Sequence, residues 1–420
     1  MNTAVDPASP WAVLGLSPTL LHAVAARAYA APTPVQSAAI APALQGRDLI
    51  ACAPTGSGKT AAFGLPLLHR LDSQRRPAWR RTYALVLVPT RELALQVGET
   101  LRELARGMAD PVKVAVVFGG VSVNPQMLGL RGGAELVVAT PGRLLDLVER
   151  NAVRLDDVAQ LVLDEADRLL DQGFAEELAR IASLLPPGRQ SLFFSATFPP
   201  AVTALAATLL HDPLQIDLPA AAEGHPDRVV QRAVNVDVAQ RTPLLRHLIV
   251  QHDWRQVLVF VATRYACEHV ADKLRRAGIE AAAFHGELSQ GARSRLLATF
   301  QSGALRVLVA TDVAARGLHI AGLPVVVNHD LPRSPTDYTH RIGRTARAGA
   351  EGLALSFVPA AAEAHFRLIE KRQGRRVPRE QIAGFEPRDA APAPPLAGGG
   401  VKGRRKSRKD KAREAASRAP

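Results

Sequence analysis

The sequence has few cysteines, no long apolar run and fewer acidic than basic residues. Its 420 residues include two cysteines, Cys52 and Cys267, which lie far apart and form neither a metal-binding nor a disulfide pattern. This usage favours a reducing compartment, and we expect a cytoplasmic protein. No apolar run reaches about 18 residues, which argues against a membrane span. The first 16 residues lack the basic segment and apolar core of a signal peptide.

The deficit of acidic side chains gives the chain a strong positive charge. Asp and Glu number 39 against 52 Lys and Arg, so the net charge is +13. This excess suggests a polyanionic partner, nucleic acid before a membrane surface, because no basic amphipathic helix stands out. A solvated arginine-rich surface is the alternative. Part of the excess follows the segment "APAPPLAGGG" (391–400), so we expect residues 389–420 to form a disordered basic tail.

Short apolar runs that end in small or polar residues alternate with helical stretches along the chain. The runs span 48–53, 83–89, 112–120, 134–141, 160–167 and 190–197, and then 256–263, 279–286, 305–312, 324–330 and 352–358. This alternation is typical of doubly wound parallel sheets, whose ligands bind at the carboxyl ends of the strands. We therefore predict two α/β domains, 1–217 and 228–388, joined by a linker at 218–227, with a substrate cleft between them.

The segment "APTGSGKTAAF" (53–63) has the pattern of a phosphate-binding loop. Gly56 and Gly58 allow the backbone to wrap a polyphosphate, Lys59 reaches the outer phosphates, and the Thr60 hydroxyl is a ligand for Mg²⁺. A helix that begins near Lys59 adds its N-terminal amides to the anion site. Because an apolar strand precedes the loop, the segment predicts a nucleoside triphosphate site.

Three carboxylates follow the apolar run in "LVLDEADRLLD" (161–171). Acids at the carboxyl end of a buried strand must be solvated, paired or bound to a metal. With a phosphate loop upstream, we assign Asp164 to Mg²⁺, mostly through water. We assign Glu165 to the attacking water, as a general base or an orienting acceptor.

An arginine-rich motif lies in the predicted second domain, which has no phosphate loop of its own. In "HRIGRTARAG" (340–349), Arg341, Arg344 and Arg347 recur every three residues, which predicts one helical face. We interpret this domain as a partner that closes over the nucleotide, with arginines that neutralise charge on the transferring phosphoryl group. A solvated basic helix face is the alternative.

These motifs stand in a fixed order along the chain. They are "PTPVQ" (32–36), "APTGSGKT" (53–60), "PTRELALQ" (89–96), "GG" (119–120), "TPGR" (140–143), "DEAD" (164–167), "SAT" (195–197), "VFVATR" (259–264), "FHGELSQGAR" (284–293), "ATDVAARG" (310–317) and "HRIGRTARAG" (340–349). Over residues 11–388 the chain resembles the DEAD-box RNA helicases of helicase superfamily 2. Its short flanks, the segment "SATFPP" and the basic tail are most similar to the bacterial RhlE type.

The resemblance implies two tandem RecA-like domains and ATP and Mg²⁺ as cofactors. The implied catalytic residues are Lys59, Asp164, Glu165, Arg344 and Arg347, with Mg²⁺ held by Thr60 and Asp164. The implied ATP-binding residues are Trp11, Tyr29, Gln36, Thr55, Gly56, Ser57, Gly58, Lys59, Thr60 and His319. Gln36 would read the adenine edge beside an aromatic wall of Trp11 or Tyr29. The residues expected to couple hydrolysis to domain closure are Asp167, Ser195, Thr197 and His340.

RNA is the implied partner, bound across both domains through its backbone and therefore largely independently of sequence. The expected contacts are Thr90, Arg91, Gly120, Thr140 and Arg143 in the first domain, and Thr263, Arg264 and Thr311 in the second. Each of these residues taken alone also fits an ordinary loop or helix-cap position. Two positions depart from the family: Ala28 replaces a usual Gly, and His319 replaces an Asp that contacts the ATP ribose. A packing role without nucleotide contact is the alternative for His319.

The resulting hypothesis is an ATP-dependent RNA helicase that opens or remodels short duplexes locally. We expect a monomer with ribosomal or RNA-decay protein partners and no membrane partner. One alternative is an ATP-dependent RNA clamp or scaffold in a ribonucleoprotein complex, and another is a DNA translocase of the same superfamily. The basic tail would add non-specific RNA affinity, or else only solubility.

Overall fold

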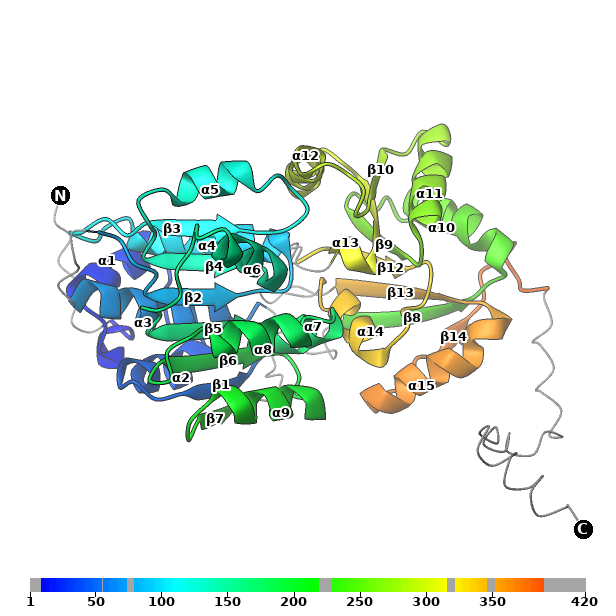
Figure 1. The fold of residues 1–420 in the computed structure, drawn as a ribbon. Helices are drawn as coiled ribbons and strands as arrows, with labels where there is room; N and C mark the ends of the chain where they lie inside the picture. Colours follow the sequence, from blue (N-terminus) through cyan, green and yellow to red (C-terminus); the bar gives the residue numbers. More distant parts are fainter. Residues whose placement is uncertain are drawn as a thin grey trace, which may run out of the picture.

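Two parallel β-sheets, one in each half of the chain, organise the molecule (Figure 1). The computed structural model describes residues 9–54, 56–73, 79–218, 229–315, 322–345 and 352–388. The first sheet has seven strands in the order β3-β4-β2-β5-β6-β1-β7, and the second has seven in the order β10-β11-β9-β12-β13-β8-β14. Consecutive strands in the sequence are often not neighbours in the sheet, because helices connect them as crossovers. The predicted α/β class is confirmed.

Every apolar run identified in the sequence contains a strand. The strands of the first sheet are β1 (Leu49–Cys52), β2 (Ala84–Leu87), β3 (Val114–Val117), β4 (Leu136–Ala139), β5 (Gln160–Asp164), β6 (Gln190–Ser195) and β7 (Leu214–Asp217). Those of the second are β8 (Val229–Asn235), β9 (Val257–Val261), β10 (Ala281–Phe284), β11 (Val307–Thr311), β12 (Val325–Asn328), β13 (Gly352–Val358) and β14 (Arg379–Glu380). Strands β7, β8 and β14 were not predicted, because at and next to a sheet edge they mix polar with apolar residues.

Helices cover the two sheets. Those of the first half are η1 (Ala12–Leu14), α1 (Pro18–Ala26), α2 (Pro34–Leu44), α3 (Lys59–Ser73), α4 (Arg91–Ala105), α5 (Asn124–Leu130), α6 (Pro141–Glu149), α7 (Ala166–Asp171), α8 (Ala175–Ser183) and α9 (Pro200–Leu209). Those of the second are η2 (Val238–Gln240), α10 (Arg241–Gln251), α11 (Arg264–Arg276), α12 (Gln290–Gln301), α13 (Asp312–Ala315), α14 (Pro335–Ile342), η3 (Ala360–Ala362) and α15 (Glu363–Gln373). Helix α3 begins at Lys59, where the phosphate-loop pattern predicted it.

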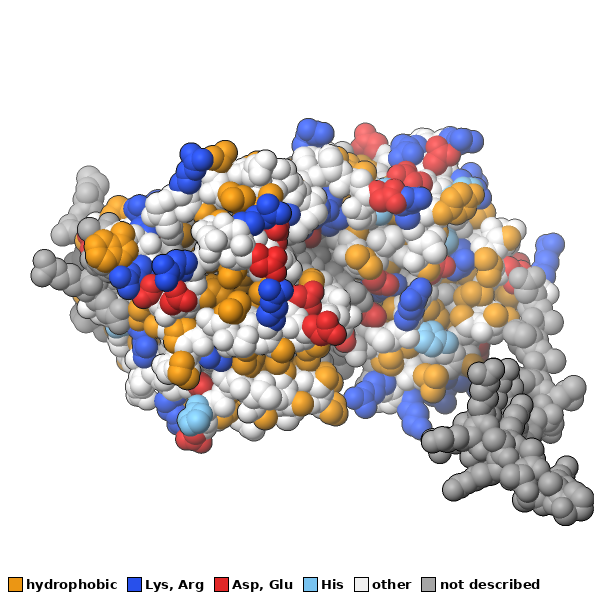
Figure 2. Space-filling model, viewed as in Figure 1, with side chains coloured by type: hydrophobic (Ala, Val, Ile, Leu, Met, Phe, Trp, Pro, Cys, Tyr) orange, Lys and Arg blue, Asp and Glu red, His pale blue; other side chains and the backbone are white. Residues whose placement is uncertain are grey.

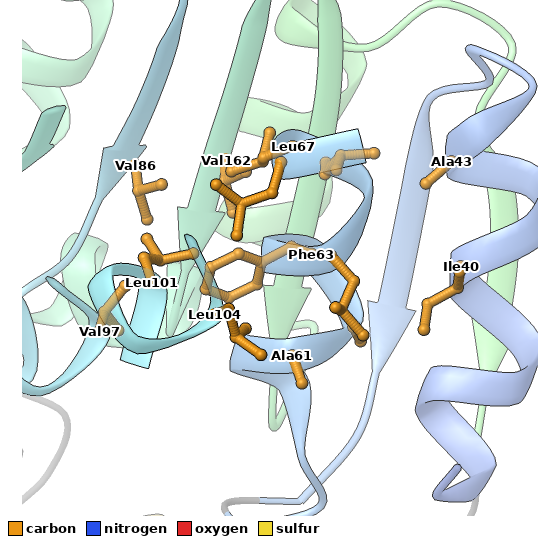
Figure 3. Close-up of a cluster of buried hydrophobic side chains, with 14 of the residues drawn as sticks. Ile40, Ala43, Ala61, Phe63, Leu67, Val86, Val97, Leu101, Leu104 and Val162 are labelled. Atoms are coloured by element: carbon orange, nitrogen blue, oxygen red, sulfur yellow. The ribbon is translucent and has the colours of Figure 1, made fainter. Parts of the chain in front are cut away.

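Helix α3 is fixed by burial on several sides (Figure 3). Phe63 is fully buried and points toward Leu101 and Leu104 of α4, with Val162 of β5 beside it. A fully buried Phe side chain contributes about 1.5–3 kcal/mol through the hydrophobic effect. This packing holds the N-terminus of α3, and with it the phosphate loop, at the carboxyl ends of β1 and β5.

The predicted domain boundaries and tail fall largely outside the described residues. Strand β7 ends at Asp217 and β8 begins at Val229, so only Leu218 of the predicted linker 218–227 is described. Residues 389–420 are likewise not among the described ones. Within the part of the chain that the structure describes, no helix has the length and apolar character needed to cross a bilayer.

Ala28 adopts a left-handed backbone conformation, with φ of 53°. It follows the end of α1, where its amide donates to the Ala25 carbonyl at 2.9 Å and the amide of Tyr29 donates to the Val24 carbonyl at 3.3 Å. Glycine is the usual residue at such a helix end, because a Cβ makes this conformation unfavourable. Ala28 therefore forms the same turn that glycine would form, but it lowers the free energy of unfolding.

Replacing Ala28 by Gly is expected to raise the free energy of unfolding by about 1 kcal/mol, because the strain at φ of 53° is removed. The matched control is Ala25→Gly, an exposed position inside α1, which is expected to lower it by about 1 kcal/mol. Denaturant unfolding of both variants, followed through the far-UV signal, measures the effect. Destabilisation by Ala28→Gly would contradict the prediction.

Candidate functional site

The phosphate loop lies between β1 and α3 with its glycines in conformations that other residues rarely adopt. Gly56 and Gly58 have φ of 83° and 92°. The Lys59 side chain is buried, and its Nζ donates to the Ala53 carbonyl at 3.0 Å. Thr60 occupies the first turn of α3, and Thr55 lies outside the described residues. The loop thus keeps the lysine amine beside its own backbone.

The "PTPVQ" segment packs directly on this loop. The Gln36 amide nitrogen donates to the Gly58 carbonyl at 3.0 Å, and its oxygen accepts from the Thr33 amide at 2.8 Å. The Thr33 hydroxyl donates to the carbonyl of Ser57 at 2.7 Å. A Cβ on Gly58 would overlap the Gln36 amide, so only glycine fits here. The reading of adenine by Gln36 stays a prediction.

Trp11 and Tyr29 lie together near the start of the described chain. Their rings stack with centroids 6.2 Å apart, and the Trp11 indole nitrogen donates to the Tyr29 carbonyl at 2.9 Å. Trp11 is 2% exposed and belongs to the hydrophobic core, whereas Tyr29 is partly buried against that core. Of the two, Tyr29 retains more surface for a nucleobase.

The acids that follow β5 occupy different environments. Asp164 is buried, and burial raises its pKa to about 7 against the attraction of Lys59. Glu165 has φ of 53° and its carboxylate oxygen Oε2 accepts from Nη1 of Arg168 at 3.0 Å. Burial alone would raise the pKa of Glu165, but the charges of Arg168, Lys59 and Arg344 outweigh burial and hold its pKa below the usual value. Glu165 therefore stays ionised.

Asp167 is tied to the "SAT" segment after β6. Its carboxylate accepts from the Thr197 hydroxyl at 2.7 Å and from the Thr197 amide at 3.1 Å. The Asp167 amide donates to the Ser195 hydroxyl at 3.2 Å. Burial, together with the charge of Arg168, lowers the pKa of His340 to about 4, so its imidazole is neutral at pH 7. Asp167 and Glu165 of the first half oppose that shift, so their charges act on His340 across the domain interface.

The prediction that Arg341 and Arg344 share one helical face is wrong. Helix α14 ends at Ile342, and Thr345 beyond it pairs with Leu323 in a short parallel bridge. The Arg341 guanidinium is buried and donates to the Asp312 carboxylate at 2.6 and 2.7 Å, which makes it a structural residue. Arg344 lies in the turn after the helix. Arg347 and His319, both predicted site residues, lie outside the described residues.

The two halves of the chain meet around these groups (Figure 1, α7 beside α14). Arg168 of the first half and Arg344 of the second line one small cavity with His340. Arg344 also lowers the pKa of Glu165, so its charge acts across the interface. Catalytic candidates from opposite halves are therefore assembled in one place.

The predicted RNA contacts lie at the carboxyl ends of the strands, as parallel sheets require. Thr90 and Thr263 cap α4 and α11, and each side chain accepts from an amide in the first turn. Thr140 accepts from the Gly119 amide at 3.2 Å, and Arg143 donates to the Val121 carbonyl at 2.6 Å. Two further predicted contacts are arginines that pair with acids: Arg91 donates to Glu92, and Arg264 pairs with Glu287. The last two are Gly120, whose φ is 80°, and Thr311, the final residue of β11.

A buried ion pair between the halves was not predicted. Glu92 at the start of α4 accepts from Arg293 of α12 at 2.9 Å, and their side chains are 10% and 3% exposed. The Arg293 guanidinium also lies 4.5 Å from the Phe284 ring centroid and donates to the Ala314 carbonyl at 3.1 Å. Both residues stand inside motifs recognised in the sequence, but no local signal pairs residues 200 positions apart.

Comparison with known proteins matches both halves of the chain. Residues 33–205 match the DEAD/DEAH box helicase family, and residues 240–349 match the helicase conserved C-terminal domain. The chain is 38% identical over 366 residues to the DEAD-box ATP-dependent RNA helicase CshA of Bacillus cereus, covering 87% of this chain and 68% of that protein. It is 44% identical over 329 residues to the ATP-dependent RNA helicase DbpA of Escherichia coli, covering 78% and 70%.

The chain belongs to the DEAD-box ATP-dependent RNA helicases. The helicase is therefore an ATP-binding, ATP-hydrolysing enzyme, as the family resemblance implied, and the nucleoside triphosphate site predicted from its phosphate loop is confirmed as an ATP site. The assignment to the RhlE type within the family stays a prediction. Its predicted RecA-like tandem fold is confirmed by solved structures of relatives.

The arrangement of the helicase's two halves is similar to that in ligand-bound relatives. The TM-score is 0.78 to Saccharomyces cerevisiae Dbp5 bound to RNA and ADP BeF3, at 31% identity, covering 89% of this chain and 96% of that chain. It is 0.79 to Mss116p bound to ssRNA and AMP-PNP, at 27% identity, covering 90% and 80%. A Dbp5 variant bound to Nup159, Gle1, IP6 and ADP scores 0.60 at 31% identity, covering 88% and 96%. Since identity and coverage barely differ between the Dbp5 structures, the higher score reflects a more similar placement of the halves.

Replacing Glu92 by Gln in this helicase is expected to raise about tenfold the RNA concentration that gives half-maximal ATPase activity. This change corresponds to a loss of about 1.4 kcal/mol in the free energy of domain closure. The reason is that Arg293 loses a charged partner at a buried interface. Titration of the ATPase with RNA measures the shift, with Glu99→Gln on the exposed face of α4 as control. In the Glu92→Gln/Arg293→Gln double variant, the loss of closure free energy should be smaller than the sum of the losses in the two single variants. Strict additivity would show that the two residues do not act as a pair.

Proposed function

We propose that ATP and RNA together close the two domains of this helicase, and that closure is what makes ATP hydrolysis fast. The observation that carries the proposal is that Arg168, which pairs with Glu165, lines one cavity together with His340 and Arg344 of the second domain. A catalytic centre divided in this way is complete only when both domains meet. RNA that binds across both domains then favours the closed form and so stimulates hydrolysis.

In the proposed reaction, Glu165 accepts a hydrogen bond from the attacking water and orients it toward the γ-phosphorus of ATP. A bond forms between the water oxygen and the γ-phosphorus while the water gives up a proton to Glu165. The bond from that phosphorus to the β–γ bridging oxygen breaks, and this oxygen leaves as part of ADP. Lys59 and Arg344, with Arg347, neutralise the charge that spreads over the phosphoryl oxygens. Asp167 then connects this site to the "SAT" segment through Thr197, and its charge acts on His340 of the second domain.

The residues present fit a magnesium ion bound together with the nucleotide. Asp164 is a buried carboxylate at the end of β5, and Thr60 lies in the first turn of α3 beside Lys59. Among the described residues there is no cluster of three or more His, Cys, Asp or Glu able to hold a metal ion. One carboxylate and one hydroxyl suit Mg²⁺, which takes its other ligands from water and phosphate oxygens. When bound, the ion would neutralise charge on the β- and γ-phosphates.

RNA would follow the strand ends of both domains and be held through phosphate and sugar. Support comes from hydroxyl, amide and arginine groups at Thr90, Thr140, Arg143 and Thr263, which suit backbone contacts. On the face shown in Figure 2, Lys and Arg side chains are interspersed with Asp and Glu rather than gathered into one basic patch. We expect binding to depend on the groups named above, and local strand separation to follow from closure around one strand. We further propose a cytoplasmic monomer that acts with ribosomal or RNA-decay proteins.

The test is the RNA dependence of ATP hydrolysis and of strand separation by the full chain. Added single-stranded RNA is expected to raise kcat for ATP at least about tenfold, and DNA of the same sequence to do so much less, because 2′-hydroxyl contacts distinguish the two. A short RNA duplex with a fluorescent strand reports separation in parallel. An ATPase rate that RNA leaves unchanged would contradict the proposed coupling.

A further inference from the structure

Arg168, the residue directly after the "DEAD" motif, forms an ion pair that none of the assigned roles uses. Its Nη1 donates to Oε2 of Glu165 at 3.0 Å, and the two side chains are 5% and 8% exposed. The Arg168 amide also donates to the Glu165 carbonyl at 2.9 Å. Both backbone and side chain therefore tie Arg168 to Glu165 in the first turn of α7.

Glu165 needs such a partner because its own backbone is strained. Its φ of 53° and ψ of 52° are left-handed values that a non-glycine residue keeps only where its surroundings enforce them. The bond from Arg168 fixes Oε2, which leaves Oε1 as the better placed oxygen to accept from the attacking water. A side chain held by one oxygen presents the other in a fixed direction.

Residues of the second domain lie against the Arg168 end of this ion pair. Arg168 lines a cavity of about 20 Å³ whose other lining residues all belong to the second domain, among them Phe260, Asp312, His340 and Arg344. An exposed ion pair contributes little, because water screens it and its side chains remain mobile. The same pair shielded from water is held much more tightly. Closure of the domains would therefore strengthen the contact between Arg168 and Glu165 by keeping water away from the Arg168 guanidinium.

We propose that Arg168 is a positioning residue that links domain closure to the orientation of Glu165. The inference rests on the proposed function, because it concerns the water that Glu165 orients. Arg168 acts through Glu165 and does not touch the nucleotide. A direct contact between Arg168 and the γ-phosphate is the competing possibility, and it predicts a different result in a double-variant cycle.

The experiment measures kcat and KM for ATP at saturating RNA for the full chain, Arg168→Ala, Arg168→Lys, Glu165→Gln and the Arg168→Ala/Glu165→Gln double variant. Arg168→Ala is expected to lower kcat about tenfold to a hundredfold with KM for ATP within about twofold. Arg168→Lys should recover most of the loss, because an ammonium group still donates to Oε2. In the Glu165→Gln background, single-turnover hydrolysis should change less than about twofold on adding Arg168→Ala.

An equal loss from Arg168→Ala in both backgrounds, or a rise in KM with kcat unchanged, would overturn the proposal. Arg180→Ala is the matched control, since Arg180 pairs with Glu149 at 2.8 Å on an exposed surface of the same domain. If Arg168→Ala does not fold, Arg168→Gln, which keeps a donor without the charge, enters the same cycle. A wild-type chain without RNA stimulation contradicts the proposed function, whereas a stimulated wild type with an unaffected Arg168→Ala variant contradicts this inference alone.

Discussion

Replacing Arg344 by alanine is expected to lower kcat for RNA-stimulated ATP hydrolysis by about a thousandfold, the lower end of what an arginine finger contributes. Arg344 is buried at the domain interface, and its charge already reaches Glu165 there. In the transition state that charge would offset the negative charge spreading over the γ-phosphoryl oxygens. ATP hydrolysis at saturating RNA measures the loss, and ATP-dependent RNA binding shows whether closure survives.

Arg344→Lys separates charge from shape at this position. Lysine keeps the positive charge but loses the planar fork that matches phosphoryl oxygens, so only a small part of the activity should return. Arg372→Ala, an exposed arginine in the last turn of α15, is the matched control and should behave as wild type. A loss below about tenfold in Arg344→Ala would rule out the assigned role.

Replacing Glu165 by glutamine is expected to lower the same kcat at least about a hundredfold, within the range for a general base. The amide has the size of the carboxylate but is a weak acceptor and cannot take a proton, so the attacking water is no longer activated. KM for ATP should change little, because Glu165 is assigned to water rather than to the nucleotide. Stopped-assay ATP hydrolysis gives kcat and KM together.

The same variant should retain RNA in the presence of ATP, because closure precedes the blocked step. Filter binding or fluorescence anisotropy with labelled RNA would detect a complex that is released more slowly than that of wild type. Glu176→Gln on the exposed side of α8 provides the control for loss of one carboxylate. Rapid ATP hydrolysis by the Glu165→Gln variant would show that another residue orients the attacking water.

Local features of the sequence were sufficient for the nucleotide loop and most of the fold. An apolar strand, glycines at positive φ and a helix starting at Lys59 are all determined by neighbouring residues, so 53–63 could be interpreted correctly. The strands at the sheet centres were likewise evident, since burial on both faces requires a continuous apolar run. Strands β7 and β8 were missed because polar residues interrupt their apolar runs, at and next to a sheet edge where some positions are exposed.

The arginines after His340 show where local periodicity misleads. Their spacing of three residues predicts one helical face, yet Arg341 is buried against Asp312 and Arg344 lies beyond the helix end. What ends the helix is the pairing of Thr345 with Leu323, a contact with a distant segment. The spacing contains no information about that contact.

By itself, the sequence determined the family and the two parallel-sheet domains, and it predicted separate roles for Asp164, Glu165 and Asp167, because motifs within a few residues carry them. Only the tertiary structure decided that Glu92 pairs with Arg293, that Arg168 holds Glu165 and that Arg344 acts on the same carboxylate. Contacts between domains depend on how two folded surfaces meet. Burial strengthens the attraction between these charged groups, because less water lies between them. Burial is a property of the closed molecule rather than of any one segment.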